Sequence, residues 1–103
     1  MTRNLDELKA LNVGSGENQA PEYINLDIRP EVKPDVVADM RSLPFPNERF
    51  ELIFASHVLE HFPWTKTKEL LTEWLRVLKP GGTLRIIVPN FAVAVKFYQV
   101  NLS

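Results

Sequence analysis

The sequence predicts an α/β protein with a doubly wound, mainly parallel sheet of five strands. Three observations predict this class: five short apolar runs, most of them rich in β-branched or aromatic residues, one amphipathic helix between the last two runs, and a glycine-containing turn after the first run. A strand, a helix and a strand in that order indicate a parallel crossover, which is nearly always right-handed. Because most runs are continuously apolar, we expect a sheet covered on both faces.

Strands are predicted at residues 10–13, 23–27, 35–39, 50–55 and 83–88. Before the first of them, Leu5, Leu8 and Leu11 suggest a short opening helix with Asn4 as its cap. This helix competes with the first strand for Leu11, so the boundary between them stays open.

The clearest helix lies in the second half of the chain, where apolar side chains recur at helical spacing: Leu70, Leu71, Trp74, Leu75 and Leu78. Thr65 or Thr67 is its expected cap, and both tryptophans, Trp64 and Trp74, are expected in the core or on the helix face. Arg76 suits the negative end of the helix dipole but is otherwise interpreted as solvated surface. The segment Pro80-Gly81-Gly82 is predicted to stop this helix and lead into the fifth strand. A second helix is expected from about residue 92 to the end.

Size and composition indicate one globular domain over residues 1–103. Apolar residues make up 45% of the 103 residues and charged residues 24%, values ordinary for a globular protein. The net charge of −1 predicts neither nucleic acid nor a membrane surface as a partner. No apolar run approaches a membrane span of ~20 residues, and the N-terminus has no signal-peptide pattern. The absence of cysteine excludes disulfides and fits the reducing cytoplasm, where we expect the protein.

The turn Gly14-Ser15-Gly16 follows the first predicted strand. In doubly wound sheets, ligands bind outside the carboxyl ends of the strands, where the strand order reverses. Glycine there lets the backbone approach a ligand closely and permits a positive φ. Gln19 stands where a dinucleotide fingerprint has its third glycine, and residues 17–22 leave little room for a helix aimed at a pyrophosphate. The turn therefore favours a ligand with ribose and adenine but no phosphate, and a simple tight turn remains the alternative.

Two carboxylates close the next two strands. Asp27 ends the second strand, where a carboxylate can accept hydrogen bonds from both ribose hydroxyls, and Asp39 ends the third. Met40, beside Asp39, could pack on a flat base or belong to the core. For both aspartates the alternative is that the side chain caps a loop.

Taken in order, five segments resemble the class I S-adenosylmethionine-dependent methyltransferases, in the broad group that includes the quinone-biosynthesis methyltransferases. These are residues 11–17, 24–28, 36–45, 50–61 and 76–90, which begin with Leu-Asn-Val-Gly-Ser-Gly-Glu and end with Pro-Gly-Gly-Thr-Leu-Arg-Ile-Ile-Val-Pro-Asn. The resemblance implies a Rossmann-like fold, S-adenosylmethionine as the cofactor, and a methyl acceptor that we expect to be a small molecule. The near absence of a helix after the glycine turn makes the chain similar to a short-loop branch of the group.

The resemblance also implies where the cofactor lies. Gly14 and Gly16 would face its methionine part, Asp27 would bind the ribose, and Ser56 would lie near the sulfonium. His57 could then act as a general base on the acceptor, unless alignment of the reacting groups is sufficient. The full set of implied cofactor-binding positions is Asn12, Gly14, Ser15, Gly16, Asp27, Ile28, Asp39, Met40 and Ser56, with Asp39 and Met40 toward the adenine.

Two departures from the family pattern stand out. Asn12 occupies the position of a usual acidic residue, two before the first glycine. The last two strands of the family sheet, which include its antiparallel strand, are predicted to be missing, as though the chain were truncated after the fifth strand. The open edge is then expected to be covered by the terminal helix or by a second copy of the chain, which would make a homo-oligomer.

Two other functions remain as alternatives. One is a minimal S-adenosylmethionine-binding or interaction domain without turnover, suggested by Asn12 and the missing strands. The remote one is a zinc hydrolase, because His57, Glu60 and His61 match the pattern H-x-x-E-H. That pattern needs a long helix, and Pro63 argues against one. No metal site is therefore predicted.

Overall fold

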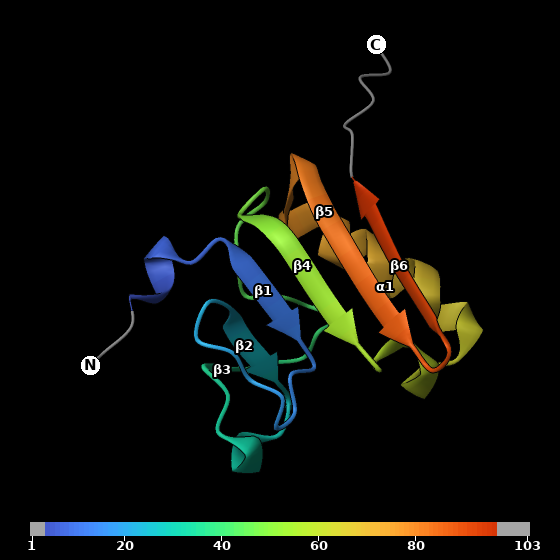
Figure 1. Cartoon of the computed structure of the whole chain (residues 1–103), viewed down its shortest axis with the longest axis horizontal. Coiled ribbons are helices and arrows are strands. Elements are labelled where there is room, and N and C mark those ends of the chain that lie inside the picture. Colours follow the sequence, from blue (N-terminus) through green and yellow to red (C-terminus); the bar gives the residue numbers. More distant parts are fainter. Residues whose placement is uncertain (1–3, 97–103) are drawn as a thin grey trace.

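The computed structural model describes residues 4–96 as one six-stranded sheet with strand order β3-β2-β1-β4-β5-β6 (Figure 1). The first five strands pair in parallel, and β6 pairs antiparallel with β5. The strands are β1 (Ala10–Val13), β2 (Ile24–Asp27), β3 (Val36–Val37), β4 (Phe50–Ser56), β5 (Leu78–Val88) and β6 (Phe91–Lys96); the helix is α1 (Trp64–Val77), and the 3₁₀ turns are η1 (Leu5–Glu7), η2 (Pro30–Val32) and η3 (Leu59–His61).

The predicted doubly wound, Rossmann-like order is confirmed. From β1 the chain adds β2 and β3 on one side, then crosses back to place β4 and β5 on the other. The order therefore reverses between β1 and β4, whose carboxyl ends lie at the same edge because the two strands are parallel. This is the edge at which such folds bind ligands.

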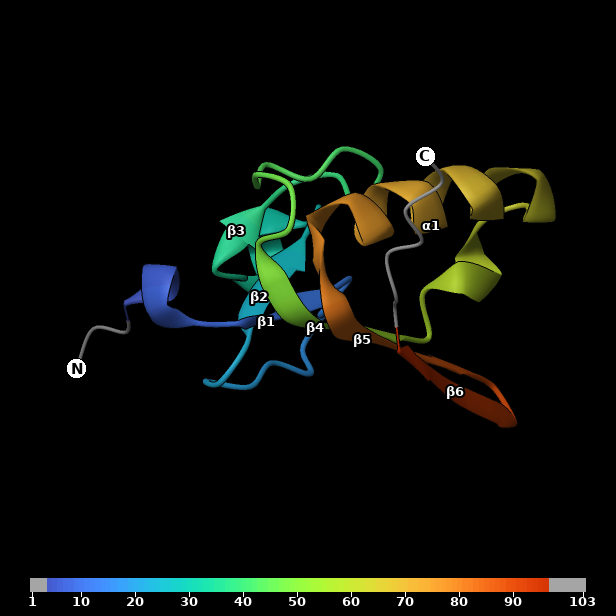
Figure 2. The same cartoon turned by 90° about the horizontal axis from the view of Figure 1, so that it is seen from above.

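Helix α1 supplies one layer of the core. It lies on one side of the sheet (Figure 2), and its residues Leu70, Trp74 and Val77 are fully buried. Within residues 4–96 it is the one α-helix, so helices do not supply the expected cover of both faces of the sheet. Burial differs along the sheet: β2 is buried throughout, as expected for a strand covered on both faces, whereas β4 tends to alternate and β6 is mostly exposed. None of the helices in this range is long and apolar enough to cross a membrane.

The start of α1 and its first tryptophan differ from the prediction. The helix begins at Trp64, directly after Pro63, and neither predicted threonine caps it. The Lys66 N–H donates to the Pro63 carbonyl (2.8 Å), which closes the first turn. Of the two places predicted for the tryptophans, the core or the helix face, the core is wrong for Trp64, which is the first residue of α1 and 85% exposed, and is confirmed for Trp74.

The opening helix is reduced to the turn η1. Asn4 does cap it, because its Oδ1 accepts from the Asp6 N–H (3.1 Å). Leu11 belongs to β1 and pairs with Ile24 on one side and Ile53 on the other. Strand partners on both sides decide the competition that local spacing left open.

Strand β5 is longer than predicted, because it begins at Leu78 and runs through the segment Pro80-Gly81-Gly82. Leu78 adopts an extended conformation at the end of α1 and pairs with Phe50, with an irregularity in register before the next pair, Leu52 with Thr83. The Pro-Gly-Gly segment is therefore part of a bulged strand rather than the helix stop.

The expected terminal helix is also wrong over residues 92–96, where the chain forms β6. A tight turn with Asn90 at φ 66° reverses the chain, and β6 then pairs with β5 from Val88 with Phe91 to Thr83 with Lys96. The sheet thus has six strands rather than the predicted five, and the antiparallel strand predicted to be missing is present as β6, which occupies the edge predicted to be open. No further strand flanks β6 within residues 4–96, and self-association along it stays a prediction. The expectation for residues 97–103 lies outside the described residues.

Gly82 is required where the backbone of β4 and the first residues of β5 approach it closely. A Cβ there would lie 2.7 Å from Leu78 Cδ1 and 2.8 and 2.9 Å from the carbonyl oxygens of Lys79 and Glu51. Because two of these atoms are backbone, we expect Gly82→Ala to lower the free energy of unfolding in urea by about 3 kcal/mol. A Cβ on the neighbouring Gly81 would meet nothing within 4 Å, and only its φ of 84° is unfavourable. Gly81→Ala should therefore lose about 1 kcal/mol, and equal losses for the two variants would contradict the steric argument.

Candidate functional site

The glycine turn after β1 depends on both of its glycines. Gly14 and Gly16 have φ angles of 64° and 52°, in the left-handed region. A Cβ on Gly14 would lie 2.7 Å from Val58 Cγ2 and 3.1 Å from Met40 Cε. The Ser15 N–H donates to the Leu26 carbonyl (3.0 Å), which ties the turn to β2. The turn is thus held close to the segments that follow β3 and β4.

Asn12 holds the loop that follows this turn. Its buried side-chain NH₂ donates to the Asn18 carbonyl (3.0 Å) and to Asn25 Oδ1 (3.1 Å). Asn25 donates in turn to the Ala20 carbonyl (2.9 Å) and to Asp35 Oδ2 (3.0 Å). A carboxylate at position 12 would set acceptors against acceptors, so this departure from the family pattern has a structural reason. The remaining polar group of the side chain, its oxygen, is an acceptor that suits a ligand ammonium.

The Asp27 carboxylate lies beside the turn and is only 6% exposed. Oδ2 accepts from the Gly16 N–H (2.8 Å) and from Arg29 Nη2 (3.4 Å). Oδ1 accepts from the Arg29 backbone N–H (2.9 Å) and from Arg29 Nε (3.1 Å). Burial acts to raise the pKa of Asp27, but these hydrogen bonds and the Arg29 charge outweigh it, so the pKa lies below its ordinary value. The side chain is therefore a carboxylate at neutral pH.

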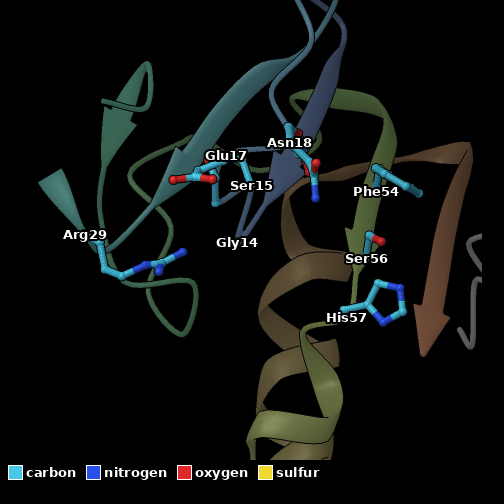
Figure 3. Close-up of a pocket in the computed structure, with 10 residues that line it drawn as sticks. Gly14, Ser15, Glu17, Asn18, Arg29, Phe54, Ser56 and His57 are labelled. Carbon is cyan, nitrogen blue, oxygen red and sulfur yellow. Dashed lines mark hydrogen bonds between the residues drawn. The ribbon is translucent and has the colours of Figure 1, made fainter. Parts of the chain in front are cut away.

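A cavity of about 730 Å³ lies at the carboxyl ends of β1 and β4. In Figure 3 the glycine turn lies on one side of it, Ser56 and His57 lie on another, and the Arg29 side chain points toward the turn. Predicted site residues make up much of its lining: Asn12, Gly14, Ser15, Gly16, Ser56 and His57, together with the unpredicted Glu17, Asn18, Arg29 and Phe54.

A second cavity of about 350 Å³ adjoins the first and shares three of its lining residues, Gly14, Arg29 and His57. Three further predicted positions line it, Asp27, Ile28 and Met40. Asp39 lines neither cavity. Its partly exposed carboxylate pairs with Arg41 (2.7 Å), whose hydrogen bonds hold the pKa of Asp39 below its ordinary value. The structure thus brings together every predicted site residue except Asp39.

Helix α1 positions the segment that contains Met40. Trp74 Nε1 donates to the Met40 carbonyl (3.1 Å). Arg76 donates to the carbonyls of Leu43 (3.1 Å) and Phe45 (3.0 Å) and pairs with Glu73 (2.8 Å), which accepts from the Leu43 N–H (2.6 Å). The interpretation of Arg76 as solvated surface is therefore wrong. Leu43 and Phe45 lie about 30 residues from Arg76 in the sequence, so no local pattern indicated these two contacts.

His57 follows β4 in a left-handed conformation, with φ 56°. Its N–H donates to the Ile87 carbonyl (2.6 Å), its half-exposed ring lines both cavities, and its Nδ1 lies 3.5 Å from Glu60 Oε2. The helix that the zinc-hydrolase hypothesis needs is not formed, because only the single turn η3 follows. Between residues 4 and 96 no group of three or more His, Cys, Asp or Glu side chains is placed to hold a metal ion.

In the larger cavity, the residues missed by the sequence analysis are Arg29, Phe54, Glu17 and Asn18, and in the second they are Arg29, Val58, His61 and Phe62. Phe54 packs against Tyr23 (ring centroids 6.1 Å apart) and lies under the Arg85 guanidinium, 5.4 Å from the ring centroid. For Arg29 the sequence did contain a signal, because an arginine two residues after a strand-end aspartate can fold back on that carboxylate. The same spacing recurs in Asp39 and Arg41.

Residues 11–86 match the family model described as a methyltransferase domain. The chain is 38% identical over 67 residues to a ubiquinone/menaquinone biosynthesis C-methyltransferase of Azotobacter vinelandii, in a match that covers 62% of this chain and 26% of that protein. It thus spans about a quarter of the length of this curated relative.

Solved structures share the fold. A SAM-dependent methyltransferase from Archaeoglobus fulgidus superposes with a TM-score of 0.64 at 20% identity, over 80% of this chain and 45% of that one. The [4+2]-cyclase SpnF superposes with a TM-score of 0.61 at 24% identity, over 77% and 38%. Because the family model covers most of the chain, the protein belongs to the methyltransferase domain family, the class I S-adenosylmethionine-dependent methyltransferases.

Proposed function

We propose that this chain binds S-adenosylmethionine in the two adjoining cavities and is the cofactor-binding core of a methyltransferase acting on a small molecule. The observation that carries the proposal is the juxtaposition of the glycine turn with the buried Asp27 carboxylate at the point where the strand order reverses. No helix follows the turn before β2, so no helix N-terminus faces a phosphate. A ligand with a ribose and no pyrophosphate suits this arrangement.

The residues present fit such a ligand. The larger cavity alone is within the range of about 300–1,000 Å³ typical of small-molecule sites. Gly14 and Gly16 line the larger cavity with backbone alone, Asp27 offers a charged acceptor for the ribose, and Ile28 and Met40 offer apolar surface beside it. When bound, S-adenosylmethionine supplies an electrophilic methyl group on a sulfonium.

His57 is placed to receive the proton that an acceptor hydroxyl or amine loses as it attacks. Its Nδ1 faces the Glu60 carboxylate, which favours the tautomer that carries its proton on Nδ1 and leaves Nε2 free as a base. The acceptor would bind beside Ser56 and His57, on the open side of the larger cavity. The Azotobacter relative is named as a C-methyltransferase, so a carbon nucleophile is a further type of acceptor beside a hydroxyl or an amine.

The second candidate is a domain that binds the cofactor without turnover. It is suggested by the [4+2]-cyclase of the same fold, which illustrates that the fold alone does not determine the reaction. Both candidates predict cofactor binding, and only the first predicts methyl transfer.

Isothermal titration calorimetry with S-adenosylmethionine and S-adenosylhomocysteine tests both. We expect saturable binding of each at micromolar concentrations, with no binding of NAD⁺ at the same concentrations. Absence of heat with both ligands at high micromolar concentration would overturn the proposal. Release of S-adenosylhomocysteine in the presence of a hydroquinone, the acceptor type suggested by the relative's name, would favour turnover over a binding domain. Binding without such release would leave the second candidate favoured for this acceptor type.

A further inference from the structure

We propose that Arg29 is a built-in competitor for the ribose site, which holds the Asp27 carboxylate until a vicinal diol displaces its guanidinium. This inference rests on the proposed function. It adds a residue that neither the glycine turn nor the family match assigns.

The number of hydrogen bonds that the Asp27 carboxylate can accept decides whether a ribose can bind to it. A carboxylate has about four lone-pair positions for hydrogen bonds. In Asp27 all four are used, two by the backbone N–H groups of Gly16 and Arg29 and two by the Arg29 side chain through Nε and Nη2. A ribose therefore finds no free acceptor on Asp27 while the guanidinium remains there.

Of the four donors to the Asp27 carboxylate, two are fixed and two can move. The two backbone donors belong to the glycine turn and to the chain after β2, so they stay in place. The Arg29 side chain is 56% exposed, whereas that of Asp27 is 6% exposed. The Nη2 bond is also the longest of the four, at 3.4 Å. The guanidinium can thus move into solvent without disturbing the rest of the site.

The hydroxyls of a vicinal diol match the guanidinium donors in number. A vicinal diol has two O–H donors, which can replace the two guanidinium donors one for one. A ligand with a single hydroxyl replaces only one of them and cannot compensate for the loss of the second hydrogen bond from the guanidinium. Arg29 also lines both cavities, so its side chain lies where the ligand must pass between them. The competition therefore lowers the affinity for every ligand, and most strongly for those without a diol.

Calorimetry with S-adenosylhomocysteine on the intact chain tests this inference. We expect Arg29→Ala to bind about 3–10 times more tightly than the unaltered chain, and Arg29→Lys, with one ammonium in place of the fork, to lie between them. Raising the salt concentration should strengthen binding to the unaltered chain, because salt screens the exposed partner of the ion pair, and should change Arg29→Ala little. Lys66→Ala removes one positive charge from a surface pair with Glu69 and should leave the affinity unchanged.

A second probe pair, adenosine and 2′-deoxyadenosine, tests the diol itself. The preference for adenosine should shrink in Arg29→Ala, because a single hydroxyl then meets a free carboxylate. Equal or weaker binding of S-adenosylhomocysteine by Arg29→Ala would overturn the role of Arg29 while leaving the proposed function intact. If neither protein binds it, the proposed function itself fails. Should Arg29→Ala not fold, as judged by circular dichroism, the Arg29→Lys variant and the salt dependence decide.

Discussion

Replacement of Asp27 with alanine is expected to lower the affinity for S-adenosylhomocysteine about a hundredfold. The variant loses the charged acceptor for the ribose, and a hydrogen bond to a charged group contributes about 1.5–3 kcal/mol. It also leaves the part-buried Gly16 N–H without its acceptor, so the glycine turn is less well ordered. Calorimetry on the folded variant measures the loss directly. Asp27→Asn, which keeps one oxygen, should lose less than Asp27→Ala.

Asp39→Ala provides the informative comparison, because Asp39 follows β3 by two residues and, like Asp27, pairs with an arginine two residues later. Since Asp39 lines neither cavity, we expect its loss to change the affinity less than threefold. A loss as large as that of Asp27→Ala would support the position of Asp39 beside the adenine, which the family resemblance implies. Unchanged binding by Asp27→Ala would show that the ribose does not bind at β2.

Replacement of Trp74 with alanine is expected to reduce the free energy of unfolding by about 3–5 kcal/mol. The ring is fully buried between α1 and the sheet, and its Nε1–H donates to the Met40 carbonyl. The variant loses both the packing and the tie that holds Met40 against the glycine turn. Urea denaturation monitored by circular dichroism gives the free energy, and the cofactor affinity of the folded fraction should fall with it.

Trp64→Ala is the matched control, since both tryptophans lie on the same helix and Trp64 is 85% exposed. A substitution at such a position should change the free energy of unfolding by no more than about 0.5 kcal/mol. Comparable losses for the two variants would contradict the structure's assignment of Trp74 to the core and Trp64 to the surface.

The glycine turn illustrates how much of the site could be predicted from the sequence. The roles predicted for Gly14, Gly16 and Asp27 depend on residue type and on short spacing. The sequence pattern therefore predicts that they lie at the ends of adjacent strands. The structure does bring nine of the ten predicted positions onto two adjoining cavities, with Asp39 the exception. The hydrogen bonds of Asn12 could not be predicted, because they depend on which donors and acceptors meet across a loop. The spacing of Asp27 and Arg29 did indicate their contact, but not that Arg29 shares the carboxylate with the Gly16 N–H.

The sequence by itself determined the α/β class, the doubly wound strand order and helix α1, because apolar periodicity and glycine punctuation are local properties of the chain. Tertiary structure alone decided the rest. Phe91–Lys96 is apolar enough for a helix or a strand, and it became β6 because β5 supplies its hydrogen-bond partners. Arg76 joined the loop 43–47 to α1 only through contacts across about 30 residues, and Arg29 came to fill Asp27 only once the turn had brought the Gly16 N–H to the same carboxylate. Non-local pairing selects among conformations that local preference leaves nearly equal, and in this protein it also determines which donors share the Asp27 carboxylate.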